Sequence, residues 1–367
     1  MASLLEELFH DLGRRATEIA EELHNCASTV PAEVEAYRAK MESRATRASA
    51  LTAAILRDPD LNAPLFAQNY YRDFRDIARL VQALEHLPLL VLRRFDSRDL
   101  VMTHILARIC AETGYPFPPP ICSSLSSQYF WTMPDMDLIF VPSLEPDRLL
   151  GLPDIYHELA HIVLFREEMR FKAPILAEIE RHFDRLRRDA THASWSPESL
   201  YELEEYRYQW RASWWLEFGA DLIATYLAGP PFGWCNIRTS TSLGGELYVG
   251  SDSHPADDAR ATAVAMMLDR INATQESAAI RQRWSELVQL SGETRPQRFE
   301  LAYPDELLSG LCNNVFGSCS QLGLRQWGLA GATEKTVGAE LHRAWNEFRQ
   351  RPESFAGYER QVVKLLT

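Results

Sequence analysis

The chain of 367 residues has no CxxC pair, no long basic segment and no long uninterrupted apolar run. Its six cysteines are scattered, which in a chain of this length indicates buried thiols in a reducing compartment, not a disulfide framework. Acidic residues outnumber basic ones by 51 to 38, so the formal net charge is −13. Neither nucleic acid nor an anionic membrane surface is therefore expected as the main partner.

Signals for export or membrane insertion are also missing from the sequence. A transmembrane helix needs roughly 18 or more consecutive apolar residues, and no stretch of the chain approaches this length. Glu6 and Glu7 stand where a signal peptide would have a basic start, and Asp11 interrupts the apolar stretch that follows. We therefore expect a cytoplasmic protein without membrane insertion.

Helical patterns dominate the sequence and predict a mainly α (α+β) fold in three parts. Apolar residues recur at helical spacing over residues 1–112, which predicts a helical N-terminal domain without a motif for chemistry. The proline-rich stretch 114–120 breaks this pattern, so a central domain is expected over 113–275 and a helical region over 276–367. Because helical bundles also provide interfaces, the N-terminal region is a candidate for binding a regulatory partner, or for occluding a site elsewhere in the chain.

The central domain is expected to combine a small β-hairpin with longer helices. Two β-like runs, Gln128–Thr132 and Asp137–Val141, are joined through a proline-containing turn and predict the hairpin. The Pro230-Pro231 pair is expected to stop a long helix and to lead into a loop or short sheet over 231–252. The expected helices share apolar residues at three- and four-residue spacing and begin near residues 154, 170, 197 and 255, with a break near Ser194–Pro197.

Residues 157–161 read His-Glu-Leu-Ala-His, an HExxH pentad within an apolar segment that predicts a buried helix. Residues four apart lie on one helix face, so His157 and His161 can bind one zinc ion, while Glu158 can reach a metal-bound water. The alternative is a helix with two partly buried histidines and a surface glutamate. The acidic residues downstream favour the metal site, with one zinc ion per chain.

A catalytic zinc needs three protein ligands and an open position, and residues 214–226 offer the third ligand. This apolar, aromatic segment contains Glu217-x-x-x-Asp221, whose acids share a helix face and are costly to bury without a cation. Glu217 is the expected ligand, and Asp221 is expected to accept the outer N–H of a ligand histidine. The competing candidates for the third ligand are Glu202, Glu204 and Glu205.

A further element, Ser253-His254-Pro255 followed by Arg260, leads from a loop into a helix. Alone it is a weak signal, because a histidine before a helix-starting proline is more often a cap or a surface residue. Behind HExxH and ExxxD, and in this order, it resembles the gluzincin class of zinc metallopeptidases. More narrowly, residues 135–270 are similar to the family of CAAX prenyl endopeptidases and heat-shock-type zinc peptidases.

The resemblance implies a zincin-like catalytic core and a role for each motif residue. The zinc ligands that it implies are His157, His161 and Glu217. Glu158 would be the general base, and Asp221 would support a ligand histidine. His254 would stabilise the oxyanion of the tetrahedral intermediate, with Arg260 ordering the site nearby. Many members of that family carry membrane helices around the motif and this chain has none, so a membrane-embedded or prenylated substrate is not carried over.

The expected function is that of a soluble zinc-dependent metallopeptidase acting on a peptide or protein substrate. Zinc would lower the pKa of its bound water towards about 7, and Glu158 would pass the water proton to the leaving amine. The edge of the strand Asp137–Val141 would hold an extended peptide. Two alternatives stay open. One is a non-catalytic, zinc-stabilised binding or regulatory protein, in which Cys235 closes the metal site, and the other is a zinc hydrolase of a non-peptide amide or ester.

Overall fold

The computed structural model describes residues 3–126, 129–143, 148–192, 195–243, 246–328 and 336–366. The fold is mainly helical and contains a small mixed sheet of three strands, which confirms the predicted fold class at this level. Gln128, at the start of the predicted hairpin, and Ser194, in the predicted break between two helices, lie outside the described residues. In the part of the chain that is described, no helix is both long and apolar enough to span a bilayer.

Contacts between residues divide the chain into two compact units. Unit 1 comprises Met1–Thr103 and Pro120–Leu125, and unit 2 comprises His104–Pro119 and Ser126–Thr367. These two units are defined by contacts between residues, whereas the three predicted domains, with boundaries near residues 112 and 275, are defined by sequence patterns. The three-part division therefore stays a prediction.

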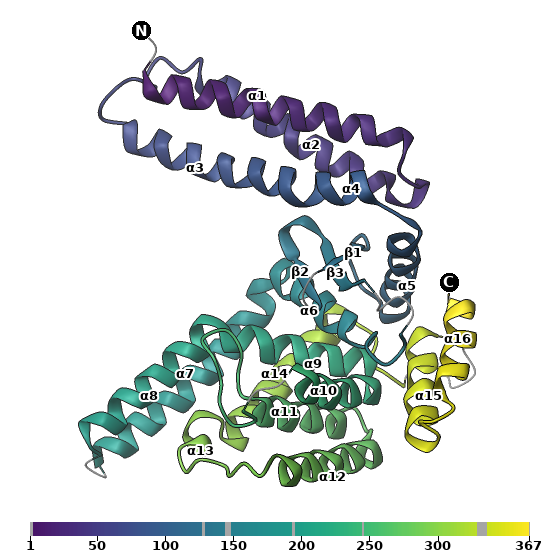
Figure 1. Cartoon of the computed structure of the whole chain (residues 1–367). Coiled ribbons are helices and arrows are strands. Elements are labelled where there is room, and N and C mark those ends of the chain that lie inside the picture. Colours follow the sequence, from purple (N-terminus) through teal and green to yellow (C-terminus); the bar gives the residue numbers. More distant parts are fainter. Residues whose placement is uncertain are drawn as a thin grey trace. The chain divides into compact units, whose positions relative to one another are not determined.

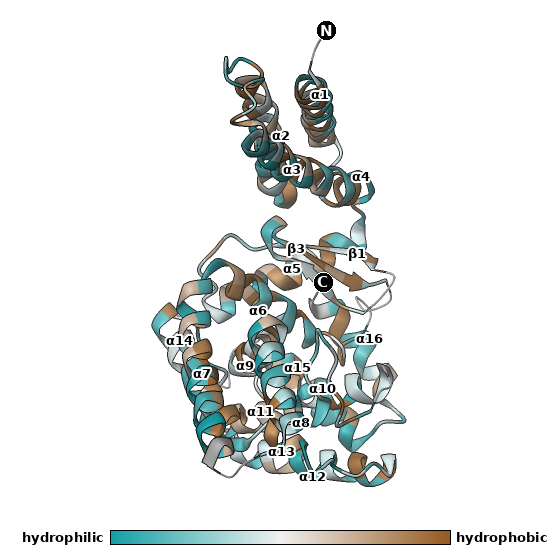
Figure 2. Cartoon of the chain, turned by 90° about the vertical axis from the view of Figure 1, so that its left-hand side faces the viewer, coloured by the Kyte–Doolittle hydropathy of each residue, from teal (hydrophilic) through white to brown (hydrophobic). Residues whose placement is uncertain are grey.

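Unit 1 is built on three long helices, α1 (Leu4–Asn25), α2 (Ala32–Ile55) and α3 (Ala67–Leu84), which pack against one another (Figure 1). α1 begins with a capping box, in which the side chains of Ser3 and Glu6 each accept the other's backbone N–H. The helices of unit 1 carry hydrophobic and hydrophilic residues together, as Figure 2 shows. Such mixing is typical of amphipathic helices. The residues that α1 buries recur every three or four positions and are Phe9, Leu12, Ala16, Ile19 and Leu23.

A π-helical turn, η2 (Glu85–Leu89), joins α3 to the short helix α4 (Leu90–Arg94). The turn contains Pro88, which has no N–H to donate and clashes with the preceding turn of a regular α-helix. A π turn has a wider hydrogen-bonding pattern, so the chain passes Pro88 without leaving the helical path. The 3₁₀ turn η1 (Cys26–Ser28) follows α1, and α5 (Ser97–Thr113) follows α4.

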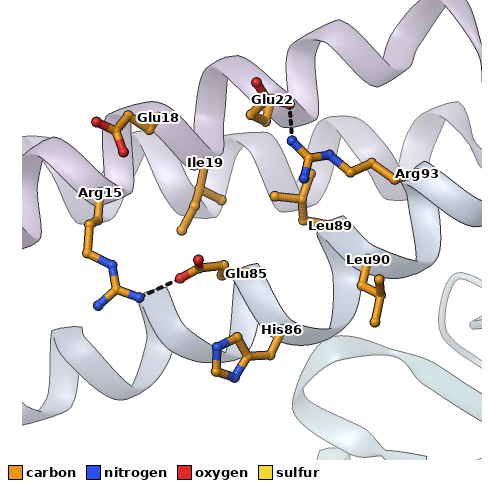
Figure 3. A pocket seen from close by; sticks show the side chains of 9 residues that line it. All are labelled: Arg15, Glu18, Ile19, Glu22, Glu85, His86, Leu89, Leu90 and Arg93. Carbon is orange, nitrogen blue, oxygen red and sulfur yellow. Dashed lines mark hydrogen bonds and ion pairs between the residues drawn. The ribbon is translucent and has the colours of Figure 1, made fainter.

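A groove of about 600 Å³ in unit 1 lies between α1 and the π turn (Figure 3). Ile19 and Leu89 are buried residues of its lining. The ion pairs that cross the groove are Arg15–Glu85 and Glu22–Arg93. Their side chains are between 40% and 51% exposed, so each pair contributes about 1 kcal/mol or less to stability. The apolar contacts between the helices are therefore the larger part of what holds this unit together.

The small sheet consists of β1 (Ile121–Ser126), β2 (Trp131–Met133) and β3 (Leu138–Pro142), in the order β1-β3-β2. β2 and β3 pair antiparallel with Trp131 opposite Phe140, and the two rings stack with their centroids 3.9 Å apart. Aromatic pairs directly across two strands stabilise a sheet. The predicted hairpin is therefore confirmed, but its first strand begins at Trp131, and Tyr129 and Phe130 lie outside it.

The position of β3 corrects the prediction that Asp137–Val141 provides a free sheet edge. That prediction is wrong because β3 is the middle strand, with β1 on one side and β2 on the other. β1 and β2 are the edge strands of the described sheet. Asp137 itself closes the turn η3 (Pro134–Met136) with a φ of 51°, a left-handed conformation that aspartate tolerates better than most residues.

In unit 2, α6 (Asp154–Arg166) packs against α9 (Trp215–Ala228), and α11 (Asp257–Arg270) also packs against α9 (Figure 1). α6 is buried over most of its length, as its apolar sequence predicts. A Cβ at Gly219 of α9 would lie 3.1 Å from a methyl carbon of Leu164 in α6. The missing side chain at Gly219 therefore lets the two helices approach closely.

Further helices complete the described part of unit 2. They are α7 (Glu168–His192), α8 (Pro197–Gln209), α10 (Pro230–Leu243), α12 (Thr274–Ser291), α13 (Phe299–Ala302), α14 (Asp305–Leu322), α15 (Val337–Gln350) and α16 (Phe355–Leu366). The π-helical turn η5 (Trp210–Trp214) joins α8 to α9, so a single helical stretch runs over 197–228. All six cysteines of the chain are buried.

The loop or short sheet predicted over 231–252 is wrong for its first half, which is helix α10. Gly229 ends α9 with a φ of 67°, and Pro230 and Pro231 then occupy the first turn of α10. Proline is favoured at this position because the first N–H groups of a helix have no partner within it. The proline pair thus follows one helix and starts the next.

Candidate metal centre

The histidines of the HExxH pentad lie side by side on one face of α6. Their Nε2 atoms are 3.1 Å apart, and the side chains of His157 and His161 are 11% and 18% exposed. The i, i+4 spacing on a helix produces this arrangement directly. The pentad therefore places two imidazole nitrogens next to each other. Both side chains are largely shielded from water but not fully buried.

Glu217 of α9 completes a group of three ligand atoms. Its carboxylate oxygens lie 3.5 Å from Nε2 of His157 and 3.6 Å from Nε2 of His161. Bonds of about 2.0–2.1 Å in a tetrahedral site separate neighbouring ligand atoms by about 3.3–3.4 Å. The separations of 3.1, 3.5 and 3.6 Å are close to this value, although each histidine is nearest to a different oxygen of Glu217, so this buried group could hold a metal ion.

The competing acids of α8 do not join this group. Glu202 forms an ion pair with Arg298, and Glu204 lies 3.6 Å from Arg187. Neither of them, nor Glu205, belongs to a cluster of His, Cys, Asp and Glu placed to hold a metal among the described residues. The geometry therefore favours Glu217 as the third ligand over the three alternatives.

Asp221 connects His157 to Arg260, whose side chain is 17% exposed. Its Oδ1 lies 2.9 Å from Nδ1 of His157, and both of its oxygens accept bonds from Arg260, at 2.7 and 2.8 Å. Burial would raise the pKa of Asp221, but Arg260 and His157 outweigh it and lower that pKa. An ionised carboxylate at Nδ1 favours the tautomer in which Nε2 of His157 has a lone pair for a metal.

The two histidines have opposite proton affinities in the metal-free site. Burial, followed by the neighbouring His157, lowers the pKa of His161 to about 4. Burial also disfavours the charged form of His157, but the carboxylates of Asp221 and Glu217 outweigh it and raise the pKa to about 10. A metal ion thus meets one imidazole that is already neutral and one from which it must displace a proton.

Glu158 is buried beside the first histidine, with only 6% of the residue exposed. Burial is the main cause that raises its pKa, to about 7, and the neighbouring carboxylates of Glu217 and Asp154 act in the same direction. A carboxylate with a pKa near neutrality can take up and release a proton at physiological pH. The environment therefore suits Glu158 to general base chemistry.

His254 reaches the same centre from the loop before α11. Its Nε2 lies 3.8 Å from Oε2 of Glu217, and its side chain is 59% exposed. Arg260, one helical turn into α11, also approaches Glu217, at 3.9 Å. Contacts in the structure thus bring together six of the sequence-predicted residues, which are His157, His161, Glu217, Asp221, His254 and Arg260. The seventh, Glu158, is buried on the same helix as the two histidines, and its pKa responds to the charges of His157 and Glu217.

Cys235 takes a different position from the one suggested by a closed four-ligand site. Its thiol is buried and donates to Oδ2 of Asp154 at 3.3 Å, and it is not part of the group formed by the three ligands. Asp154 also accepts bonds from Tyr129 and Thr239. This polar cluster at the start of α6 was not predicted, although an acid three residues before the pentad is visible in the sequence.

Comparisons of the chain with protein-family models, curated proteins and solved structures find no match. The chemistry of the centre therefore rests on its own residues. Three features define that chemistry: a group of three residues that could hold a metal ion, the buried carboxyl group of Glu158 next to His157 in the sequence, and the exposed imidazole of His254 near Glu217.

Proposed function

We propose that the protein is a zinc-dependent metallopeptidase with a zincin-like core, in which His157, His161 and Glu217 hold the ion. The observation that carries the proposal is the set of ligand separations, 3.1, 3.5 and 3.6 Å, with Glu158 buried next to the first ligand. A structural zinc site has four protein ligands and commonly uses cysteine. Three ligands with a base beside them are typical of a catalytic site, and the ordered motifs resemble those of gluzincins.

Zinc in this position supplies Lewis acidity for the hydrolysis of a carbonyl compound. Glu158 takes a proton from the attacking water and later delivers it to the leaving amine. The Nε2–H of His254 donates a hydrogen bond to the oxyanion that develops on the substrate. Asp221, held by Arg260, keeps His157 in the required tautomer and orientation.

An extended peptide is the substrate class that we infer for this centre. β2 is an edge strand of the described sheet and contacts α6, which carries the pentad. Backbone groups on an unpaired strand edge can bind a further strand by hydrogen bonds. A peptide added to β2 would lie beside a strand that contacts α6, so we assign the peptide-binding edge to β2 and not to Asp137–Val141.

The test compares metal content and hydrolysis in a matched set of variants. Purified protein is expected to bind about one equivalent of zinc, measured by atomic emission after dialysis, and to cleave members of a mixed peptide library. Glu158→Gln should keep the metal and lose about three orders of magnitude in kcat. Glu167→Gln is the control, because this residue lies at the end of α6 and pairs with Arg170.

The same experiment separates the proposal from its alternatives. Hydrolysis by Glu158→Gln at the rate of the unchanged protein would contradict the mechanism. Zinc binding without cleavage of any peptide, but with cleavage of small amides or esters, would favour a non-peptide hydrolase. Zinc binding without hydrolysis of either class would favour a binding or regulatory protein.

A further inference from the structure

The loop that carries His254 depends on hydrogen bonds for its conformation. The side chain of His254 is 59% exposed, and the loop residues Ser251, Asp252 and Ser253 are exposed as well. Packing against a hydrophobic core therefore cannot fix the imidazole ring. A catalytic donor must nevertheless be placed to within a fraction of an ångström.

Side chains from the π-helical turn η5 hold this loop at two consecutive residues. The indole Nε1–H of Trp214 donates to the carbonyl oxygen of Ser251 at 2.8 Å. The hydroxyl of Ser213 donates to the carbonyl oxygen of Asp252. Gln209, directly before the turn, adds a bond from its amide to the Asp252 carboxylate at 3.2 Å. The bonds from Trp214 and Ser213 thus fix the backbone at Ser251 and Asp252, which directly precede Ser253 and His254.

The other end of the loop contacts Tyr303, an aromatic residue that packs against Trp214. The hydroxyl of Tyr303 accepts the backbone N–H of Ala256 at 3.2 Å, and the ring of Tyr303 lies 4.9 Å from that of Trp214. Both rings are only 4% exposed. A Cβ at position 250 would lie 2.6 Å from the Tyr303 hydroxyl, so Gly250 permits the close approach of the loop to Tyr303.

Within the loop, serine side chains orient the imidazole. Ser251 bonds the backbone of His254 in both directions, since its N–H donates to the His254 carbonyl at 2.7 Å and its hydroxyl accepts the His254 N–H at 3.0 Å. The hydroxyl of Ser253 lies 2.8 Å from Nδ1 of His254. A hydroxyl that donates to Nδ1 leaves the ring proton on Nε2, which is the nitrogen nearest to Glu217.

We propose that Ser213 and Trp214 of the π turn, together with Ser253, are positioning residues that hold His254 at the metal centre with Nε2–H available to the substrate. This inference rests on the proposed function. Glu217 follows Trp214 by three residues in one helical stretch, so the third metal ligand and the support of the loop belong to the same rigid element. π turns are frequent at functional sites, because the extra residue redirects the side chains around it.

The test is a double-mutant cycle on zinc-loaded protein. Trp214→Phe keeps an aromatic ring and removes the N–H donor, and Ser213→Ala removes the second donor. Each is expected to lower kcat by about tenfold with KM and zinc content unchanged. His254→Ala should lower kcat by about 100-fold, and Trp214→Phe added to it should cost nothing more, because the two residues act through one interaction.

The matched control is Trp234→Phe, which removes the indole N–H that Trp234 of α10 donates to Glu276 of α12 and that bonds no residue of the His254 loop. Two outcomes would overturn the proposal. One is a kcat within about twofold of the unchanged protein for both Trp214→Phe and Ser213→Ala while His254→Ala is impaired. The other is an equal loss from Trp214→Phe whether or not His254 is present, since that would show a general effect on the structure.

A second readout does not require hydrolysis. Imidazole ¹⁵N shifts of His254 in the zinc-loaded protein should report a single tautomer with the proton on Nε2. Ser253→Ala and Trp214→Phe should each produce a mixture of tautomers or ring orientations. Unchanged His254 signals in both variants would overturn the inference. Failure of the unchanged protein to cleave any substrate would instead count against the proposed function, and the ¹⁵N shifts would still test the loop.

Discussion

At the scale of single residues, the metal centre depends on buried charges behind its ligands. Asp221 is fully buried and lies between His157 and Arg260. The planar guanidinium matches both carboxylate oxygens, which is the strongest geometry for such a pair. Replacing Asp221 leaves His157 and Arg260 without their charged partner in a largely buried place. We therefore expect the replacement to weaken metal binding and to lower the free energy of unfolding.

Asp221→Asn is expected to weaken zinc binding by about 10- to 100-fold, because the amide removes the charge that orients His157. Competition with a chromogenic chelator measures the change in affinity. Asp269→Asn is the control, because this aspartate pairs with Arg281 on the surface of α11 and α12. Equal zinc affinity in Asp221→Asn and Asp269→Asn would show that the carboxylate has no part in holding the ligand.

Zinc binding at about pH 8.5 is expected to release one proton from His157 and a further proton from the metal-bound water, whose pKa zinc lowers towards about 7. The pKa of His157 is raised to about 10, so this imidazole carries a proton in the metal-free protein and must lose it to bind. His161, with a pKa of about 4, and Glu158, with a pKa of about 7, are already deprotonated at that pH. Calorimetry in buffers of different ionisation enthalpy measures the release, and heats that do not depend on the buffer would contradict the prediction.

At the scale of secondary-structure elements, the contact of α6 with α9 determines the site. Each helix supplies ligands at positions fixed by its own geometry, and the distance between the helices sets whether the ligands meet. Gly219 lies in this interface against Leu164. It also lies between Glu217 and Asp221 in sequence, so a displacement of the helices at this point would move both acids.

Gly219→Val is expected to destabilise the protein by about 2 kcal/mol, because the added side chain must displace Leu164 in a packed interface. Zinc affinity should fall at the same time. Gly317→Val in α14 is the control, since an added Cβ there has no atom within 4 Å. Thermal denaturation with and without zinc gives both quantities. A Gly219→Val protein as stable as the control would show that α6 and α9 can separate freely.

The sequence predicts those parts of the site that depend on one element at a time. HExxH and ExxxD are visible because each is a four-residue spacing on one helix, and α6, α9 and α11 are confirmed as helices. The support of the His254 loop is not visible, because Trp214 and Ser251 are 37 residues apart and only the fold brings them together. The helix α10 is missed because a proline pair carries both a stop and a start signal.

At the scale of the whole molecule, the division into two compact units separates the metal centre from the N-terminal helices. All three proposed ligands belong to unit 2, and the described part of unit 1 contains no group of side chains placed to hold a metal. Binding energy acts on the unit whose folding creates the site. The two units are therefore expected to respond differently to zinc.

Calorimetric unfolding is expected to show two transitions, of which zinc shifts only that of unit 2. Free zinc at about 100 times its dissociation constant should stabilise that unit by about 2.7 kcal/mol, and a chelator should reverse the shift. His161→Ala should abolish the response, while the unit 1 variant Arg93→Ala should keep it. A single transition that moves as a whole with zinc would show that the two units unfold together.

The burial of every cysteine has a practical consequence. Cys26 and Cys122 lie in unit 1, and Cys110, Cys235, Cys312 and Cys319 lie in unit 2. An alkylating reagent can reach such thiols only when the structure around them opens. Mass spectrometry of the alkylated peptides would thus time the opening of each unit separately, with natural reporters and without any introduced label.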